Sequence, residues 1–257
     1  MSVPKRLAAG LLAALLIPAA AVATGAEPAP PEAEARPAEP RPIEPRLTVE
    51  RGGPGAPRVA LTFDACDGGA DRRILDVLVE NRIPATFFVT AIWIRRNPAA
   101  LALLKAHPDL YAIENHGARH VPAIDRPTMV YGLKAAGSPE AVRAEVEGGS
   151  RAIEAATGRR PQWYRGAGAV YTPATIAAIR AMGFRIAGYS LSVEAGTRLD
   201  AHKAAERLGK ARDGDVVLAH ANHPAWPTGA GIAAGILALK EAGFQFVGLD
   251  EPAARGR

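Results

Sequence analysis

The chain has 257 residues, of which 48% are hydrophobic and 22% are charged, and it contains a single cysteine. These values are typical of a globular protein and exclude collagen-like, coiled-coil and disulfide-scaffold classes. The formal charge of +5 is spread among neighbouring acids and bases, as in Asp71-Arg72-Arg73, without a long Lys/Arg run. We therefore expect no nucleic-acid partner.

The first 26 residues have the three-part pattern of a secretory signal peptide. Lys5 and Arg6 precede an apolar stretch over 7–23, which Pro18 interrupts, and small residues follow it. We expect cleavage, no stable membrane insertion afterwards, and an exported protein, either periplasmic or secreted. A retained anchor is the alternative, but the apolar run is short for a bilayer span of about 20 residues.

Residues 27–46 alternate Pro, Glu, Ala and Arg and contain almost no large apolar side chain. Such a segment cannot bury enough surface to offset its ordering entropy, so it is predicted to be an extended tether. Residues 47–257 are predicted to form one catalytic domain.

Within this domain, short β-prone runs alternate with segments of helical pattern. The predicted strands cover 59–63, 85–90, 110–113, 162–164, 185–189, 215–218 and 245–249. The predicted helices cover 72–81, 98–106, 139–157, 173–182, 201–211 and 230–242. Repeated strand–helix alternation favours an α/β fold with parallel strands, and about seven repeats favour a closed or distorted barrel over its rival, a doubly wound sheet. No glycine-rich nucleotide-binding motif, which is typical of the doubly wound fold, follows any predicted strand.

Polar residues gather where four of the predicted strands end. Asp64, His116, Arg165 and His220 each follow or close an apolar run. Because the carboxyl ends of parallel strands open on one face, these side chains are predicted to converge.

His116 and His120 stand four residues apart and could ligate one divalent ion together with a carboxylate, leaving positions open for water. The alternative is two solvent-facing histidines. Asp64 could merely cap a helix, but after an apolar strand a carboxylate needs a cation or strong donors, and Arg165 could be one. Arg165 could equally serve a purely structural ion pair.

His220 is either a core histidine satisfied by a backbone carbonyl or, beside a carboxylate, a protonated acid. Cys66 could be a nucleophile or a thiolate ligand, although cysteines are more often inert. As the only cysteine, it cannot form an intramolecular disulfide.

Five segments in this order resemble the polysaccharide deacetylases of the NodB-homology type, carbohydrate esterase family 4. They are Leu61-Thr-Phe-Asp64, Ala85-Thr-Phe-Phe-Val89, Asn115-His116-x-x-x-His120, Tyr164-Arg165 and Val217-Leu-Ala-His220. The resemblance spans about 57–250 and implies a distorted (β/α)7 barrel and metal-dependent removal of acetyl groups from N-acetylated sugars. By this likeness Asp64 is the catalytic base, His116 and His120 are metal ligands, Arg165 orients the base, and His220 is the general acid.

The chain departs from the family pattern at several positions. Ala65 stands where the family has a second aspartate that binds the metal, so we expect Asp67, or failing it Asp71, to replace that ligand. The cofactor expected from the resemblance is one Zn²⁺, with Co²⁺, Ni²⁺ or Mn²⁺ as alternatives.

The segment after Arg165 lacks the usual prolines and aromatic residue. A backbone N–H near Gly168 could still face the oxyanion, and Tyr171 or Trp226 could replace the sugar platform. Glu194 is expected by position to keep His220 charged, as the partners of catalytic histidines do.

The leading hypothesis is an exported deacetylase acting on an N-acetylated or O-acetylated polysaccharide, such as peptidoglycan or an extracellular glycan. A second is a catalytically impaired glycan-binding member of the same fold. A third is a thiol hydrolase that uses Cys66 with His116 or His223.

Overall fold

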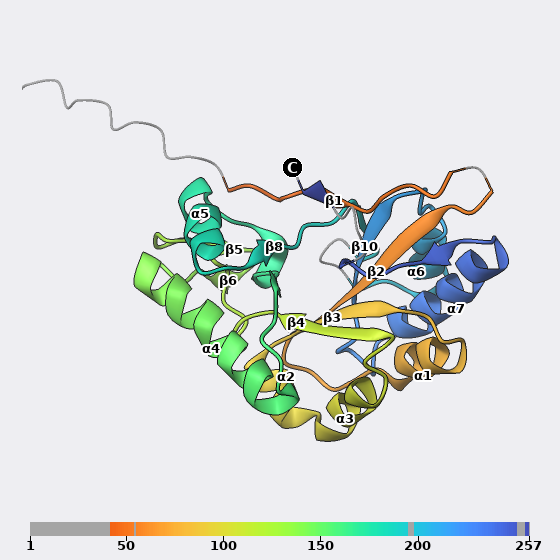
Figure 1. Ribbon diagram of the computed structural model, residues 1–257, viewed down its shortest axis with the longest axis horizontal. Coiled ribbons are helices and arrows are strands. Elements are labelled where there is room, and N and C mark those ends of the chain that lie inside the picture. Colours follow the sequence, from red (N-terminus) through yellow and green to blue (C-terminus); the bar gives the residue numbers. More distant parts are fainter. Residues whose placement is uncertain (1–41, 54, 195–197, 251–254, 257) are drawn as a thin grey trace, which may run out of the picture. The chain divides into compact units, whose positions relative to one another are not determined.

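The computed structural model describes residues 42–53, 55–194, 198–250 and 255–256 (Figure 1). The predicted signal peptide and most of the predicted tether lie outside these residues. Within the described part of the chain, no helix has the length and apolar character needed to cross a membrane.

The core of the fold is one curled, ten-stranded sheet. Its main path runs through β12 (Arg255–Gly256), β1 (Leu47–Thr48), β10 (Asp215–His220), β2 (Arg58–Ala65), β3 (Ala85–Val89), β4 (Tyr111–Asn115), β7 (Trp163–Tyr164) and β8 (Arg185–Ile186). Two short strands lie off this path: β9 (Leu191–Ser192) pairs with β10, and β11 (Gln245–Phe246) pairs with β2. The strands from β10 to β8 are parallel, which confirms the predicted α/β class and distorted barrel.

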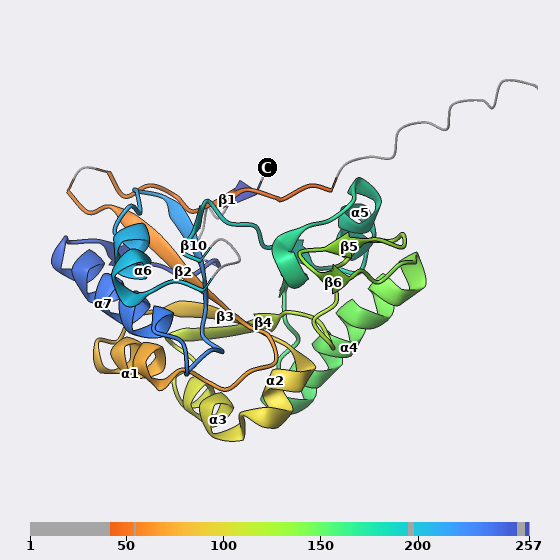
Figure 2. The same cartoon turned by 180° about the vertical axis from the view of Figure 1, so that it is seen from behind.

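Helices cover the outer surface of the curled sheet, as both views show (Figure 1, Figure 2). They are α1 (Arg72–Glu80), α2 (Ala91–Arg96), α3 (Pro98–Ala106), α4 (Pro139–Thr157), α5 (Pro173–Ala181), α6 (Ala201–Leu208) and α7 (Thr228–Glu241). Proline opens α3, α4 and α5, where its missing N–H is not needed. The sequence did not predict α2, which is short and begins at a Thr90 cap.

Alternation along β2 divides its side chains between two apolar clusters. Val59, Leu61 and Phe63 belong to the largest cluster, together with buried residues of the outer helices α1 and α7. Ala60 belongs to a second cluster with Phe88, and by the period of two Asp64 shares its face. The inward face of β2 therefore carries small and polar side chains and ends in a carboxylate.

The last residues of the predicted tether are part of the folded domain, which differs from the predicted boundary at 46. Ile43 and Tyr171 exchange two backbone hydrogen bonds. Further along, Tyr189 donates its N–H to the carbonyl of Pro45 and accepts one from Leu47. Since β1 also pairs with β10, residues 43–48 connect the segment after β8 to β10 and help to close the barrel.

A two-stranded hairpin, also missed by the sequence analysis, projects from the sheet. It consists of β5 (Met129–Val130) and β6 (Leu133–Lys134), and Tyr131 at its tip is 73% exposed. The hairpin passes close to Gly168, where an added Cβ would lie 3.1 Å from the Tyr131 ring.

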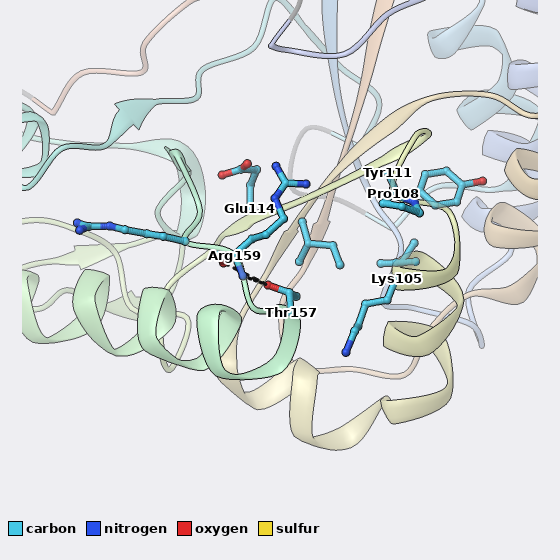
Figure 3. A pocket seen from close by; sticks show the side chains of 9 residues that line it. Lys105, Pro108, Tyr111, Glu114, Thr157 and Arg159 are labelled. Carbon is cyan, nitrogen blue, oxygen red and sulfur yellow. Dashed lines mark hydrogen bonds between the residues drawn. The ribbon is translucent and has the colours of Figure 1, made fainter.

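A pocket of about 100 Å³ lies between α3, β4 and the end of α4 (Figure 3). Its lining includes Lys105, Tyr111, Glu114 and Thr157, and none of its lining residues belongs to the predicted site. Glu114 is buried, and its carboxylate accepts hydrogen bonds from the backbone N–H groups of Gln162 and Trp163. Burial raises the pKa of Glu114 to about 7, although these two hydrogen bonds partly oppose the shift.

This raised pKa predicts a pH-dependent stability. The folded protein holds the Glu114 proton more tightly than the unfolded chain, so this contribution to stability is full below pH ~4.5 and is lost as the pH rises through about 7. We expect Glu114→Gln to raise the free energy of unfolding at pH 8 by up to about 3 kcal/mol, with little change at pH 5. Urea unfolding at both pH values measures this, with exposed Glu154→Gln as the control. A change of equal size at both pH values would contradict the assignment.

Candidate active site

The register of the parallel strands brings the predicted residues to one edge of the barrel. His220 of β10 pairs directly with Asp64 of β2. Along the same edge Val89 pairs with Asn115, and Asn115 with Tyr164, so the residues that follow these strands also meet. The predicted convergence of Asp64, His116, Arg165 and His220 is therefore present in the structure.

Arg165 is fully buried and makes a dense set of hydrogen bonds. One guanidinium nitrogen donates to Asp64 Oδ1 and to Thr62 Oγ1, both at 2.9 Å. The others donate to the carbonyls of Ala187 and Gly188, and the guanidinium lies 4.3 Å from the centre of the Phe88 ring. The Asp64 carboxylate is thus fixed in position by a charge-assisted hydrogen bond.

His116 is oriented by a hydrogen bond at 2.6 Å between its Nδ1 and the carbonyl of Arg165. A carbonyl can only accept, so Nδ1 carries a proton, and Nε2 is the ring atom that offers a lone pair whenever the imidazole is neutral. That atom lies 3.6 Å from Cys66 Sγ and 3.8 Å from Asp64 Oδ2. The His120 ring lies beside it, with the two ring centres 4.9 Å apart.

Cys66, His116 and His120 each present one ligand atom, and these atoms lie within 4.8 Å of one another. This is the group in the described part of the chain that could hold a metal ion. It differs from the predicted ligand set, because Asp67 is exposed and lies outside the group. The fallback ligand Asp71 instead caps α1 and pairs with the Arg73 guanidinium at 2.5 Å.

Burial and neighbouring charges have opposite effects on the pKa values of Asp64 and Cys66. Burial alone would raise the pKa of Asp64, but the positive charge of Arg165, followed by those of His116 and His220, lowers it overall. Burial would also raise the pKa of Cys66, yet hydrogen bonds to His116, His120 and His220 bring it well below its usual value. Asp64 is therefore anionic near neutral pH, and the Cys66 thiol loses its proton more readily than a free cysteine does.

His220 and Glu194 form the predicted pair, with Nδ1 2.7 Å from Glu194 Oε2. Burial alone would lower the pKa of His220, but hydrogen bonds to Cys66 and Glu194 and the Glu194 charge raise it well above its usual value. A protonated imidazole therefore faces Asp64 across the edge of the barrel.

The predicted substrate-binding residues lie in three different environments. Gly168 adopts a left-handed backbone (φ 72°) just after Arg165. Tyr171 is fully buried and its hydroxyl accepts the Gly166 N–H, so it offers no sugar platform, contrary to that prediction. Trp226 is part-exposed and stacks on His223, with ring centres 3.8 Å apart.

The sequence analysis missed a buried residue, Glu145 of α4, that holds the loop between the two histidines. Its Oε1 accepts the backbone N–H groups of Arg119 and Val121, on either side of His120. His120 itself has a left-handed backbone (φ 63°), which non-glycine residues rarely adopt. The Glu145 carboxylate therefore stabilises the strained turn that positions His120.

Comparisons with known proteins identify the family of this chain. The family model for polysaccharide deacetylase matches residues 51–187, and the chain belongs to that family. A chitooligosaccharide deacetylase from Sinorhizobium fredii is 41% identical over 76 residues, which are 28% of this chain and 34% of the relative. The chain thus spans about a third of the length of that curated relative.

Solved structures with the same fold include both enzymes and a pseudoenzyme. The T48 deacetylase with substrate is 25% identical, with a TM-score of 0.61 and coverage of 76% of this chain and 89% of its own. PdaA of Bacillus subtilis, a family 4 carbohydrate esterase, is 18% identical, with a TM-score of 0.61 and coverage of 82% and 96%. A family 4 pseudoenzyme from Bacillus anthracis is 23% identical, with a TM-score of 0.61 and coverage of 78% and 66%. These structures confirm the predicted fold.

The role of Glu145 predicts a difference between two substitutions. Glu145→Ala removes the acceptor for two backbone N–H groups, and we expect it to weaken Zn²⁺ binding by about 10–100-fold. Glu145→Gln keeps a carbonyl oxygen at that place and is expected to stay close to the wild type. Competition with a chromophoric chelator measures both affinities, with circular dichroism to show that each variant is folded. Equal affinities for the two variants would contradict the role.

Proposed function

We propose that this protein is an exported, metal-dependent deacetylase that removes acetyl groups from an N-acetylated polysaccharide. The observation that carries the proposal is the arrangement at one barrel edge. Asp64 is held ionised by Arg165, and a protonated His220, held by Glu194, faces it. Amide hydrolysis needs such a pair, because one group must accept a proton and another must donate one.

The residues divide the reaction between them. Asp64 Oδ1 is occupied by Arg165, so Oδ2, on the side of His116, accepts the proton of the attacking water. The water oxygen bonds to the acetyl carbon and the C–N bond then breaks. His220 donates its proton to the departing sugar nitrogen, which leaves as an amine, and acetate is the second product.

The imidazoles and thiol beside Asp64 fit a divalent ion. Nitrogen and sulfur donors suit Zn²⁺ and its neighbours Co²⁺ and Ni²⁺ better than Mg²⁺ or Ca²⁺. When bound, such an ion supplies Lewis-acid polarisation of the acetyl carbonyl and lowers the pKa of a coordinated water. His116 and His120 would hold it, and Zn²⁺ is the proposed native metal.

The proposed cellular location and the proposed polymeric substrate are supported by different observations. The charged, apolar and small-residue pattern of residues 1–26 supports export to a periplasm or the cell exterior. There, peptidoglycan and extracellular glycans are the accessible N-acetylated polymers. The similarity to a chitooligosaccharide deacetylase supports a substrate built from N-acetylglucosamine.

Release of acetate from chitooligosaccharides or peptidoglycan fragments by the metal-loaded protein tests the proposal. We expect Asp64→Asn to lower kcat by about 10²–10⁴-fold, since the amide cannot accept the proton, while glycan binding persists. Asp109→Asn, an exposed acid paired with Arg82, serves as the matched control and should retain activity. Chelation should abolish turnover and one divalent ion should restore it.

The same experiment addresses the alternative of a catalytically impaired glycan-binding protein. That alternative predicts equal glycan binding by the wild type and Asp64→Asn with no acetate release from either. Such a result, obtained with stoichiometrically bound metal, would overturn the proposed activity.

Glu194 acts through His220, and its substitution predicts a dependence on the leaving group. In Glu194→Gln the pKa of His220 falls, so the alkaline limb of kcat should move to lower pH and kcat for N-acetyl glycans should fall by about 10–100-fold. An aryl acetate, whose leaving group needs no proton, should be hydrolysed at nearly the wild-type rate. Asp64→Asn should lose activity toward both substrates. Equal losses of Glu194→Gln on both would assign Glu194 a purely structural role.

A further inference from the structure

We propose that the Cys66 thiolate is the third protein ligand of the metal, giving a Cys-His-His site in place of an acid and two histidines. This inference rests on the metal dependence of the proposed function. It adds that a sulfur donor, from the residue after Ala65, replaces the family's carboxylate ligand, and that the site therefore selects thiophilic ions of the Zn²⁺ type over Mg²⁺ and Mn²⁺.

The distance between Cys66 and His116 matches that of two ligands on one tetrahedral ion. Zinc bonds of about 2.3 Å to sulfur and about 2.0–2.1 Å to nitrogen, at the tetrahedral angle, place the two ligand atoms about 3.6 Å apart. The separation of Cys66 Sγ and His116 Nε2 is 3.6 Å. The chain thus already holds these donors at ligand spacing.

The orientation of the donors agrees with this role. His116 donates through Nδ1 to the Arg165 carbonyl, which directs the free Nε2 toward Cys66, as metal-binding histidines commonly arrange. Cys66 is 6% exposed, and the His120 ligand atom completes a group within 4.8 Å. Two histidines and one thiolate leave a fourth position for water or substrate, the composition of a catalytic zinc site.

The nearby carboxylates either have other partners or lie outside the group of ligand atoms. Asp64 accepts from Arg165 through Oδ1, and Asp71 is paired with Arg73 and caps α1. Asp67 is exposed, and its carboxylate lies outside the group of ligand atoms that Cys66, His116 and His120 form. A thiolate ligand therefore leaves Asp64 available as a base.

Because Cys66 is the only cysteine of the chain, spectroscopy of the Co²⁺ form tests the proposal without ambiguity. We expect one bound Co²⁺ to show a sulfur-to-cobalt charge-transfer band in the near ultraviolet. Cys66→Ser should abolish the band and weaken Zn²⁺ binding by at least about 10-fold. Cys66→Asp should lose the band as well, and the preference for Zn²⁺ over Mn²⁺ should narrow because an oxygen donor replaces sulfur.

Asp67→Asn separates the two candidate third ligands. We expect this variant to keep both the charge-transfer band and the Zn²⁺ affinity of the wild type. If Asp67→Asn instead binds Zn²⁺ more weakly, and the Co²⁺ spectrum shows no sulfur band, the proposal is overturned in favour of Asp67 as the third ligand. Stoichiometric Co²⁺ binding without the band in the folded wild type would also overturn it, even if acetate is released. A band with no acetate release from any N-acetyl glycan would instead contradict the proposed function and leave the ligand assignment standing.

Discussion

The buried ion pair between Arg165 and Asp64 is the interaction on which the site depends. Arg165 joins four strands or strand extensions, since its side chain contacts Asp64 and Thr62 on β2 and the carbonyls after β8, while its own carbonyl orients His116 after β4. Removing one partner of such a pair costs about 3–5 kcal/mol, because an uncompensated charge stays buried. The same contacts that hold the barrel edge together therefore also fix the proposed base, Asp64, and one proposed metal ligand, His116.

Asp64 and Glu194, two buried carboxylates at this edge, each have their own positive partner. Arg165 balances Asp64, and His220 balances Glu194. Cys66 faces the imidazoles of His116 and His120, and a divalent ion between them would compensate its charge. This separation gives Asp64 and His220 a counter-charge each, in Arg165 and Glu194, which is the arrangement that the proposed proton transfers require.

Much of the fold and part of the site followed from the sequence, for identifiable reasons. Helices α3 and α4 have the predicted bounds because proline marks their starts, and Gly158 ends α4 in a left-handed conformation. Strand ends located Asp64, His116, Arg165 and His220, because apolar runs are visible in sequence and parallel strands share one edge. The short elements α2, β5 and β6 carried too few residues for any periodicity to appear.

What sequence could not provide was the direction of side chains within loops. Asp67 was the expected third ligand because it is the acid nearest Ala65, yet its side chain is exposed and Cys66 faces the histidines instead. Tyr171 was expected at the surface as an aromatic beside the site, but its hydroxyl is needed by the buried Gly166 N–H. Glu145, which positions His120, lies 25 residues further along the chain, and nothing local connects the two.

A comparison of Asp64 with Glu114 shows why two buried carboxyl groups of the same sheet differ in their pKa. Asp64 pairs in register with Phe88, which pairs with Glu114, so the two carboxyl groups stand in one row two strands apart. Both are buried, but the pKa of Asp64 is lowered while burial raises that of Glu114 to about 7. Glu114 accepts two backbone N–H groups, whereas Asp64 accepts a guanidinium. Amide donors alone do not offset desolvation here, and a full positive charge does. The ionised state of Asp64, the proposed base, is thus a consequence of Arg165 and not of the barrel interior itself.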